Sequence, residues 1–175
     1  MKQLIVLITI FSFFFTGCED NDPGDSDRNN IILITTHDID AAGAPGFYFD
    51  FVSGEETDST GSWHISFQML SVVGTTYKMP NLVLGDVSIS EYTNLSYDDI
   101  TSTPETFQND NIQDLSALQY GGASEVLAYD MQIHKVSVNN AERVFIIQEP
   151  INNTTYKIQF IEYISGITTF KYDAL

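Results

Sequence analysis

Short runs in which every second residue is apolar or aromatic recur through the last third of the chain, and this period is that of a β-strand. The clearest is YKIQFIEY (156–163), which lies between RVFIIQ (143–148) and ITTFKY (167–172). The runs are separated by EPINNTT and by a segment ending in Gly166, and Pro, Asn and Gly between strands are typical of tight turns. The pattern predicts an antiparallel β-meander at the C-terminal end.

Two earlier runs have the same period. GFYFDFVSG (46–54) places its phenylalanines on one face of a strand, and SWHISFQML (62–70) does the same with Trp63, Ile65 and Phe67. His64 falls on the opposite face of the second strand. We therefore expect His64 to be exposed to solvent.

The rest of the mature chain adds strands and little helix. NLVLGDVSI (81–89) is a further apolar run. A short helix is expected only at Thr103, Pro104 and Glu105, which have the pattern of a cap, a first-turn proline and a first-turn acid. We therefore expect residues 31–175 to form a single all-β domain of antiparallel strands, with a C-terminal β-meander and little helix.

The first residues have the pattern of a secretory signal. Lys2 precedes an apolar run at 4–15, which is too short to span a bilayer because a transmembrane helix needs about 20 residues. A positive start and a short apolar core predict a signal peptide over residues 1–17. The ending FTGC resembles a bacterial lipobox and predicts lipidation of Cys18. The alternative is an ordinary signal peptide followed by an unmodified cysteine.

Residues 18–30 are expected to be a flexible acidic tether. They hold five acidic residues, a proline and a glycine, and no aromatic residue, so they cannot bury enough apolar area to fold. An acidic cluster directly after a lipidated cysteine resembles the surface-export signal of lipoproteins in the Bacteroidota. That likeness implies a protein anchored in the outer membrane through Cys18, with its globular part on the cell surface. A solvated spacer without such a signal is the alternative.

The mature chain is strongly acidic and cannot form an internal disulfide. Without residues 1–17 it keeps six of the seven basic residues and all 24 acidic ones, which gives a net charge of −18. A field of that sign repels nucleic acid and anionic lipid, so neither is an expected partner. Cys18 is the only cysteine, and stability must therefore come from an apolar core.

The sequence contains none of the common catalytic motifs. It has no G-x-S-x-G elbow, no H-E-x-x-H pair and no paired cysteines, and its three histidines are scattered. Asp98 and Asp99 are adjacent, so on a strand they point to opposite faces and cannot form the facing carboxylates of a glycosidase. We expect the protein not to be an enzyme.

Several stretches, taken in order, resemble the HmuY-like family of haem-binding surface lipoproteins. The likeness spans residues 45–173 and includes the lipobox. The stretches are FYFDFVSGEETD (47–58), the Trp-x-Ile-x-Phe strand at 63–67, Tyr129 followed by His134 and then VFII (144–147), and the closing YKIQFIEYISGITTFKY (156–172).

This resemblance implies a mostly β domain that holds haem between two side chains from different segments. It also implies a hemophore-like role in iron acquisition, in which the protein captures haem or relays it. The implied partners are a TonB-dependent haem transporter or a host haem protein. The alternative is a non-haem surface lipoprotein that binds a protein, peptide or glycan partner on the same fold.

Haem iron accepts imidazole nitrogen or thioether sulfur. The mature chain offers six such side chains: His37, His64, His134, Met69, Met79 and Met131. Met79 precedes a proline and is expected at a loop or strand end that a ligand can approach, whereas Met69 is expected to pack in the core. Met131 and His134 are three residues apart and lie on opposite faces if their strand is straight. The expected axial pair is therefore Met79 with either Met131 or His134.

The side chains next to these candidates suit a macrocycle with two carboxylates. Lys78 and Lys135 adjoin the candidate ligands, and Arg143 is close in sequence, so local neutralisation of the haem propionates is possible. Tyr77 and Tyr129 also lie beside the candidates, and each is expected to stack on the macrocycle or to form a hydrogen bond with it.

Overall fold

The computed structural model describes residues 31–72, 74–107 and 126–175. The predicted signal peptide, Cys18 and the acidic tether lie outside these residues. The described strands are β1 (Ile32–Thr35), β2 (Phe47–Asp50), β3 (Glu55–Thr57), β4 (Ile65–Ser71), β5 (Lys78–Leu84), β6 (Ser88–Tyr92), β7 (Leu127–Asp130), β8 (Lys135–Val138), β9 (Val144–Gln148), β10 (Thr155–Ile164) and β11 (Ile167–Ala174). Within these ranges no helix is long and apolar enough to cross a membrane.

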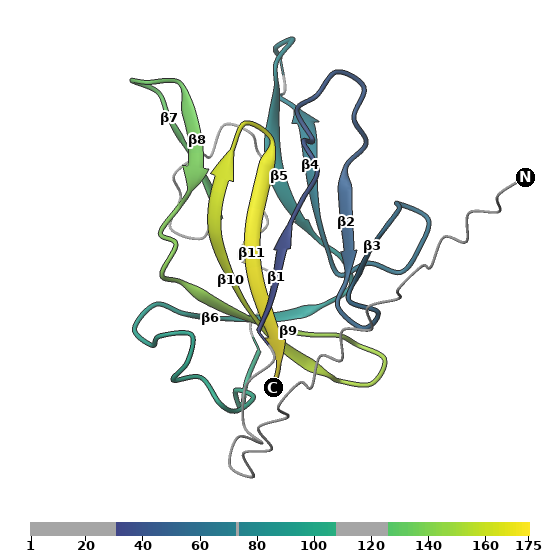
Figure 1. The fold of residues 1–175 in the computed structure, drawn as a ribbon, viewed down its shortest axis with the longest axis vertical. Helices are drawn as coiled ribbons and strands as arrows, with labels where there is room; N and C mark the ends of the chain where they lie inside the picture. The colour runs from purple at the N-terminus through teal and green to yellow at the C-terminus, as the bar shows by residue number, and fades with distance from the viewer. Residues whose placement is uncertain (1–30, 73, 108–125) are drawn as a thin grey trace, which may run out of the picture.

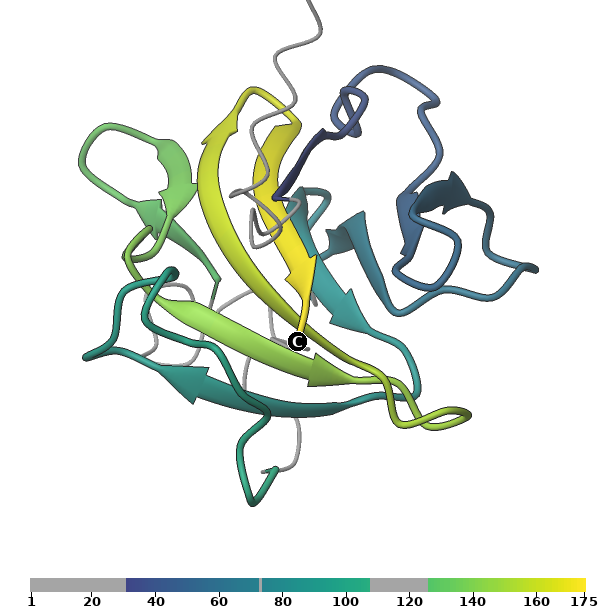
Figure 2. The ribbon, with the colours of Figure 1, turned by 60° about the horizontal axis from the view of Figure 1, so that its bottom comes forward.

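The strands form antiparallel sheets, which confirms the predicted all-β character. Five strands pair in the order β1-β11-β10-β9-β6, four pair in the order β3-β2-β4-β5, and β7 pairs with β8. The consecutive pairs β9–β10 and β10–β11 are antiparallel, as the predicted meander requires. The five-stranded sheet is strongly twisted, so that β9 and β6 cross beneath the upright β10 and β11 (Figures 1 and 2).

The main core lies between the five-stranded and the four-stranded sheets. The predicted alternation of phenylalanines in β2 is confirmed, because Phe47, Phe49 and Phe51 are all buried in this core. From β11, the Phe170 ring lies 5.5 Å from that of Phe49 and 5.9 Å from that of Phe160, measured between centroids. Aromatic rings at these separations attract one another as well as burying area, so one aromatic cluster joins the two sheets.

The turn between β10 and β11 is as tight as a hairpin allows. Ser165 and Gly166 both have positive φ, 46° and 85°, which is the arrangement of a type I′ turn and matches the twist of the flanking strands. A Cβ at position 166 would meet the backbone and side chain of Asp40 within 3 Å. Glycine is thus required at Gly166, and the turn is held against the segment that precedes β2.

Strand β9 is buried on both faces because the far side of its sheet carries a second, smaller core. Val144 and Ile146 pack there against Tyr97 and Ile100. Lys157, on the neighbouring strand β10, is buried beneath the same segment, and its Nζ donates to the backbone carbonyls of Tyr97 and Ile100 at 3.3 and 3.0 Å. The lysine therefore ties the segment around residues 97–100 to the sheet.

The short helix expected at Thr103 is absent, and that prediction was wrong. Residues 101–107 are irregular. The Thr103 hydroxyl, which would have capped the helix, instead lies 2.7 Å from the Thr155 hydroxyl of β10, and Phe107 packs against the second core. Contacts with the sheet therefore outweigh the weak local preference for a helix.

His64 is buried rather than exposed, which corrects the expectation from alternation. Only 6% of the residue is exposed. The backbone N–H of Phe51 donates to His64 Nδ1 at 3.1 Å, and the Asp50 carboxylate lies 3.1 Å from the same nitrogen. The chain leaving β2 covers this face of β4, and the Phe51 ring lies 5.9 Å from the imidazole, centroid to centroid. The alternation of residues within one strand cannot indicate that another segment packs over that strand.

The burial of His64 makes stability depend on pH. Burial lowers the pKa of His64 below its usual 6.5 and outweighs the opposing attraction of the Asp50 and Glu149 carboxylates. The unfolded chain therefore binds a proton on this imidazole where the folded chain does not, so the free energy of unfolding falls as pH drops below 6.5. We expect a lower urea midpoint at about pH 5.5 than at about pH 7.5.

The variant His64→Asn isolates this effect, because its side-chain oxygen can still accept the Phe51 N–H but does not titrate. We expect a smaller midpoint difference between the two pH values in the variant. Two carboxyls, Asp58 and Glu149, have pKa values lowered from 3.8 and 4.5 by hydrogen bonds, so they titrate below this window. The same pH dependence in both proteins would contradict a role for His64.

Candidate functional site

The candidate site is a pocket at the end of the molecule where three hairpins meet. Its walls come from the β4–β5 pair, the β7–β8 hairpin and the β10–β11 turn, which lie together at the top of Figure 1. Its volume is about 300 Å³, at the lower end of the range of small-molecule sites. Met79 and His134 both line it, and we call it the Met79–His134 pocket.

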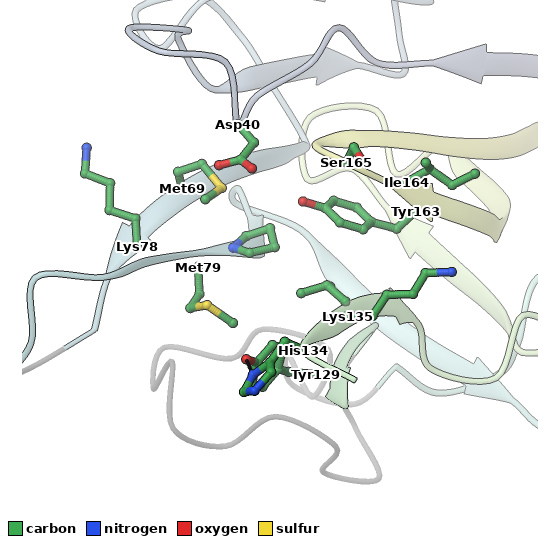
Figure 3. A pocket seen from close by; sticks show the side chains of 12 residues that line it. Asp40, Met69, Lys78, Met79, Tyr129, His134, Lys135, Tyr163, Ile164 and Ser165 are labelled. Carbon is green, nitrogen blue, oxygen red and sulfur yellow. Dashed lines mark hydrogen bonds between the residues drawn. The ribbon is translucent and has the colours of Figure 1, made fainter. Parts of the chain in front are cut away.

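Met79 is placed by the edge strand of the four-stranded sheet. It is the second residue of β5 and pairs with Leu70 of β4, which agrees with its expected position at a strand end. Pro80 follows. An edge strand tolerates a proline, which has no backbone N–H, because such a strand pairs with another strand on one side only. In Figure 3 the half-buried thioether extends from β5 toward the side of the pocket that holds Tyr129 and His134.

His134 is placed by the turn of the β7–β8 hairpin. The Asp130 carboxylate shapes this turn by accepting the backbone N–H groups of Gln132 at 2.7 Å and Ile133 at 3.3 Å. His134 closes the turn with a φ of 52°, a left-handed conformation that is uncommon for non-glycine residues, although histidine adopts it more often than most. Strained positions that keep a bulky side chain are found preferentially at functional sites.

The imidazole of His134 is held by Tyr129 through one of its two ring nitrogens. The Tyr129 hydroxyl lies 2.6 Å from Nδ1, and the two rings are 6.1 Å apart between centroids. Among the described residues, no hydrogen bond engages Nε2 of His134. A neutral imidazole with one engaged nitrogen can offer the other as a lone-pair donor to a metal.

Met131 and His134 were expected on a strand, with opposite faces if it is straight, but both lie in the turn between β7 and β8. Met131 is 79% exposed and does not line the Met79–His134 pocket. The structure therefore brings together Met79 and His134 and leaves Met131 outside. Met69 packs against the main core, as expected. It also lines the pocket from β4, which was not predicted.

The other two histidines have different surroundings. His37 has its Nδ1 3.0 Å from the Glu56 carboxylate and its Nε2 3.2 Å from the carbonyl oxygen of Pro45, so both ring nitrogens are engaged. His64 is buried between β2 and β4. In the described ranges, no group of three or more His, Cys, Asp and Glu side chains is arranged to hold a metal ion.

Positive charge gathers at the pocket although the protein is acidic. Lys78 and Lys135 both line it, and in the part of the chain that the structure describes neither ammonium has an ion-pair partner. Arg143, which is close in sequence, is instead buried elsewhere, with its guanidinium 3.1 Å from the Glu91 carboxylate. The expected neutralising role is therefore open to the two lysines and not to Arg143.

Sequence analysis did not predict the wall of the pocket that the segment before β2 and the β10–β11 turn provide. Asp40, Tyr163 and Ser165 line it there, and they come from the segment before β2 and from the β10–β11 turn. Burial raises the pKa of Tyr163 to about 12, so its phenol stays neutral even well above physiological pH. In the sequence, Gly166 marked this segment as a turn between two strands, and nothing local indicated what the turn would face.

The described arrangement offers two thioethers (Met69 and Met79), one imidazole, two ammonium groups and the Asp40 carboxylate around a small open space. No protein-family model matches the chain, and no curated protein matches it.

Proposed function

We propose that this protein is a haem-binding lipoprotein with an HmuY-like fold, which captures or relays haem for iron acquisition from an outer-membrane, surface-exposed anchor at Cys18. The observation that carries this proposal is the meeting of Met79 and His134 at one pocket, from strands and turns far apart in the chain. The proposed role is binding and not catalysis. A TonB-dependent haem transporter or a host haem protein is the proposed partner.

The residues at the pocket fit haem by their donor types. Bound haem would supply an iron that accepts imidazole nitrogen and thioether sulfur, and two carboxylates on its edge. Met79 and His134 lie on the walls of the same pocket and can supply the two donors. Lys78 and Lys135 can neutralise the carboxylates. Met79 is half-buried and His134 is exposed, so the proposed iron-binding atoms are accessible from solvent, as exchange of the ligand with another protein requires.

A titration of the purified protein with haemin, in oxidised and reduced forms, tests this proposal. We expect a saturable one-to-one shift of the Soret band, with the visible bands of low-spin iron, because two strong-field donors face one site. A flat titration in both oxidation states would contradict haem binding. It would leave the alternative, a non-haem lipoprotein that binds a macromolecular partner.

The same titration tests the two lysines. The double variant Lys78→Gln/Lys135→Gln should bind haemin more weakly, by up to about fivefold per lysine, which is the size of a solvent-exposed ion pair. The matched control is Lys171→Gln, which removes one positive charge at a site where the ammonium lies 4.1 Å from the centroid of the Tyr97 ring. Equal affinities for all three proteins would show that the lysines do not contact the ligand.

One observation favours the alternative of a protein partner. Exposed apolar side chains surround the same end of the molecule, where Tyr77 is 71% exposed and Met131 and Ile133 lie in the β7–β8 turn. Exposed apolar residues that gather around a pocket are typical of interaction surfaces. Under this alternative, changes at Tyr77 or Ile133 would weaken function and changes at His134 would not.

A further inference from the structure

We propose that Tyr129 is a positioning residue for His134: its hydroxyl engages Nδ1 of the imidazole, directs Nε2 toward the ligand, and makes that nitrogen a stronger donor to ferric iron. This inference rests on the proposed function. It assigns a role in the site to a side chain that does not itself bind the metal.

The contact between the two side chains is short and is built into the hairpin. Tyr129 and His134 stand on either side of the β7–β8 turn, and the oxygen-to-nitrogen distance is 2.6 Å. Tyr129 lies in β7, where it pairs with Val136 of β8, so a strand fixes its position. His134 lies in a turn whose backbone is fixed by the Asp130 carboxylate. The two groups therefore meet because the hairpin register brings them together.

The phenol is chemically suited to either protonation state of Nδ1. A hydroxyl can donate to a bare Nδ1 or accept from Nδ1–H. When Nε2 binds a metal, the proton of the neutral imidazole is on Nδ1, and the Tyr129 oxygen can accept it in a hydrogen bond. Outer partners of this kind fix the tautomer and ring orientation of a metal-binding histidine and raise its basicity.

A stronger nitrogen donor stabilises the more electron-poor oxidation state. Ferric iron should therefore gain more from the Tyr129 contact than ferrous iron. The reduction potential of the bound group is then lower than it would be without the hydroxyl. This difference separates positioning through His134 from a simple packing role, which would change the affinity for both oxidation states equally.

The experiment compares the wild-type protein with Tyr129→Phe and with Tyr77→Phe. Both substitutions remove a phenol hydroxyl at the same end of the molecule. Tyr77 was expected beside the macrocycle together with Tyr129, but its side chain is 71% exposed and does not line the pocket. We expect Tyr129→Phe to weaken ferric haem binding by about 10- to 100-fold and ferrous binding less. Each tenfold difference between the two losses corresponds to a rise in potential of about 59 mV. Tyr77→Phe should match the wild type.

A measurement without haem supports the same comparison. In the ¹⁵N spectrum of the haem-free protein, the Nδ1 resonance of His134 should move in Tyr129→Phe and stay in place in Tyr77→Phe. The urea midpoints of both variants should equal that of the wild type, because the lost contact is exposed. A resonance that does not move in Tyr129→Phe would overturn the inference.

The outcomes distinguish this inference from the proposed function. If the wild-type protein binds no haem in either oxidation state, both are overturned. If it binds haem and Tyr129→Phe behaves like Tyr77→Phe in affinity and potential, only the role of Tyr129 is overturned. Equal losses of ferric and ferrous affinity would assign Tyr129 to packing and would likewise overturn its effect on the donor strength of His134.

Discussion

If the proposed haem complex forms, the variant His134→Gly should lose its low-spin spectrum and at least about 100-fold in haem affinity, since removal of a ligand costs more than removal of its outer partner. At the same time it should keep the fold. Glycine is the residue best suited to the left-handed backbone at this position, where φ is 52°, and a side chain there costs about 1–2 kcal/mol. The free energy of unfolding should therefore change by less than about 1 kcal/mol.

This choice of substitution separates ligand loss from misfolding. The matched control is Asn153→Gly, which makes a similar change at a φ of 56° in the turn between β9 and β10. The control should have the haem spectrum of the wild type. The affinities and spectra come from absorption titrations, and the stabilities come from urea unfolding.

The thioether side of the pocket is tested by the same titrations. Met79→Leu keeps the size and apolar character of the side chain but removes the sulfur, so a low-spin spectrum should give way to that of iron with one strong protein ligand. Met131→Leu is its control, because Met131 does not line the pocket. If Met131→Leu changes the spectrum and Met79→Leu does not, the axial pair was assigned wrongly.

The variant Phe170→Ala should lose about 3–5 kcal/mol of unfolding free energy, the usual cost of deleting a buried aromatic side chain. Phe170 is fully buried, and its ring lies 5.5 Å from Phe49 of β2 and 5.9 Å from Phe160 of β10, centroid to centroid. The substitution therefore opens a cavity between the two sheets. A loss of this size is a large share of the roughly 5–15 kcal/mol that stabilises a typical domain.

The control for Phe170→Ala is Leu33→Ala in β1. It also removes a large apolar side chain from a strand of the five-stranded sheet, but Leu33 is 61% exposed. Its loss should stay below about 1 kcal/mol. Similar losses for both variants, measured by urea unfolding at neutral pH, would contradict the position of the core between the two sheets.

The all-β character could be predicted because it depends on local patterns, namely alternating apolar residues in strands and turn residues between them. Alternation in YKIQFIEY and Gly166 after it indicated strands separated by a turn, and β10 and β11 are where they were expected. The same local logic failed at His64 and at Thr103. In both places the residue contacts a segment that is close in space but remote in sequence. That contact, and not the local pattern, decided the surroundings of the residue.

The sequence alone supplied the donor types of the site, since imidazoles and thioethers are few in this chain, and it placed two lysines next to them. It left open whether Met131 or His134 accompanies Met79. In the tertiary structure His134, and not Met131, lines the pocket with Met79, because the register of the β7–β8 hairpin turns its imidazole toward Tyr129 and into the pocket beside β5. The reason is physical: strand periodicity is set by neighbours in sequence, whereas a pocket exists only where separate hairpins meet.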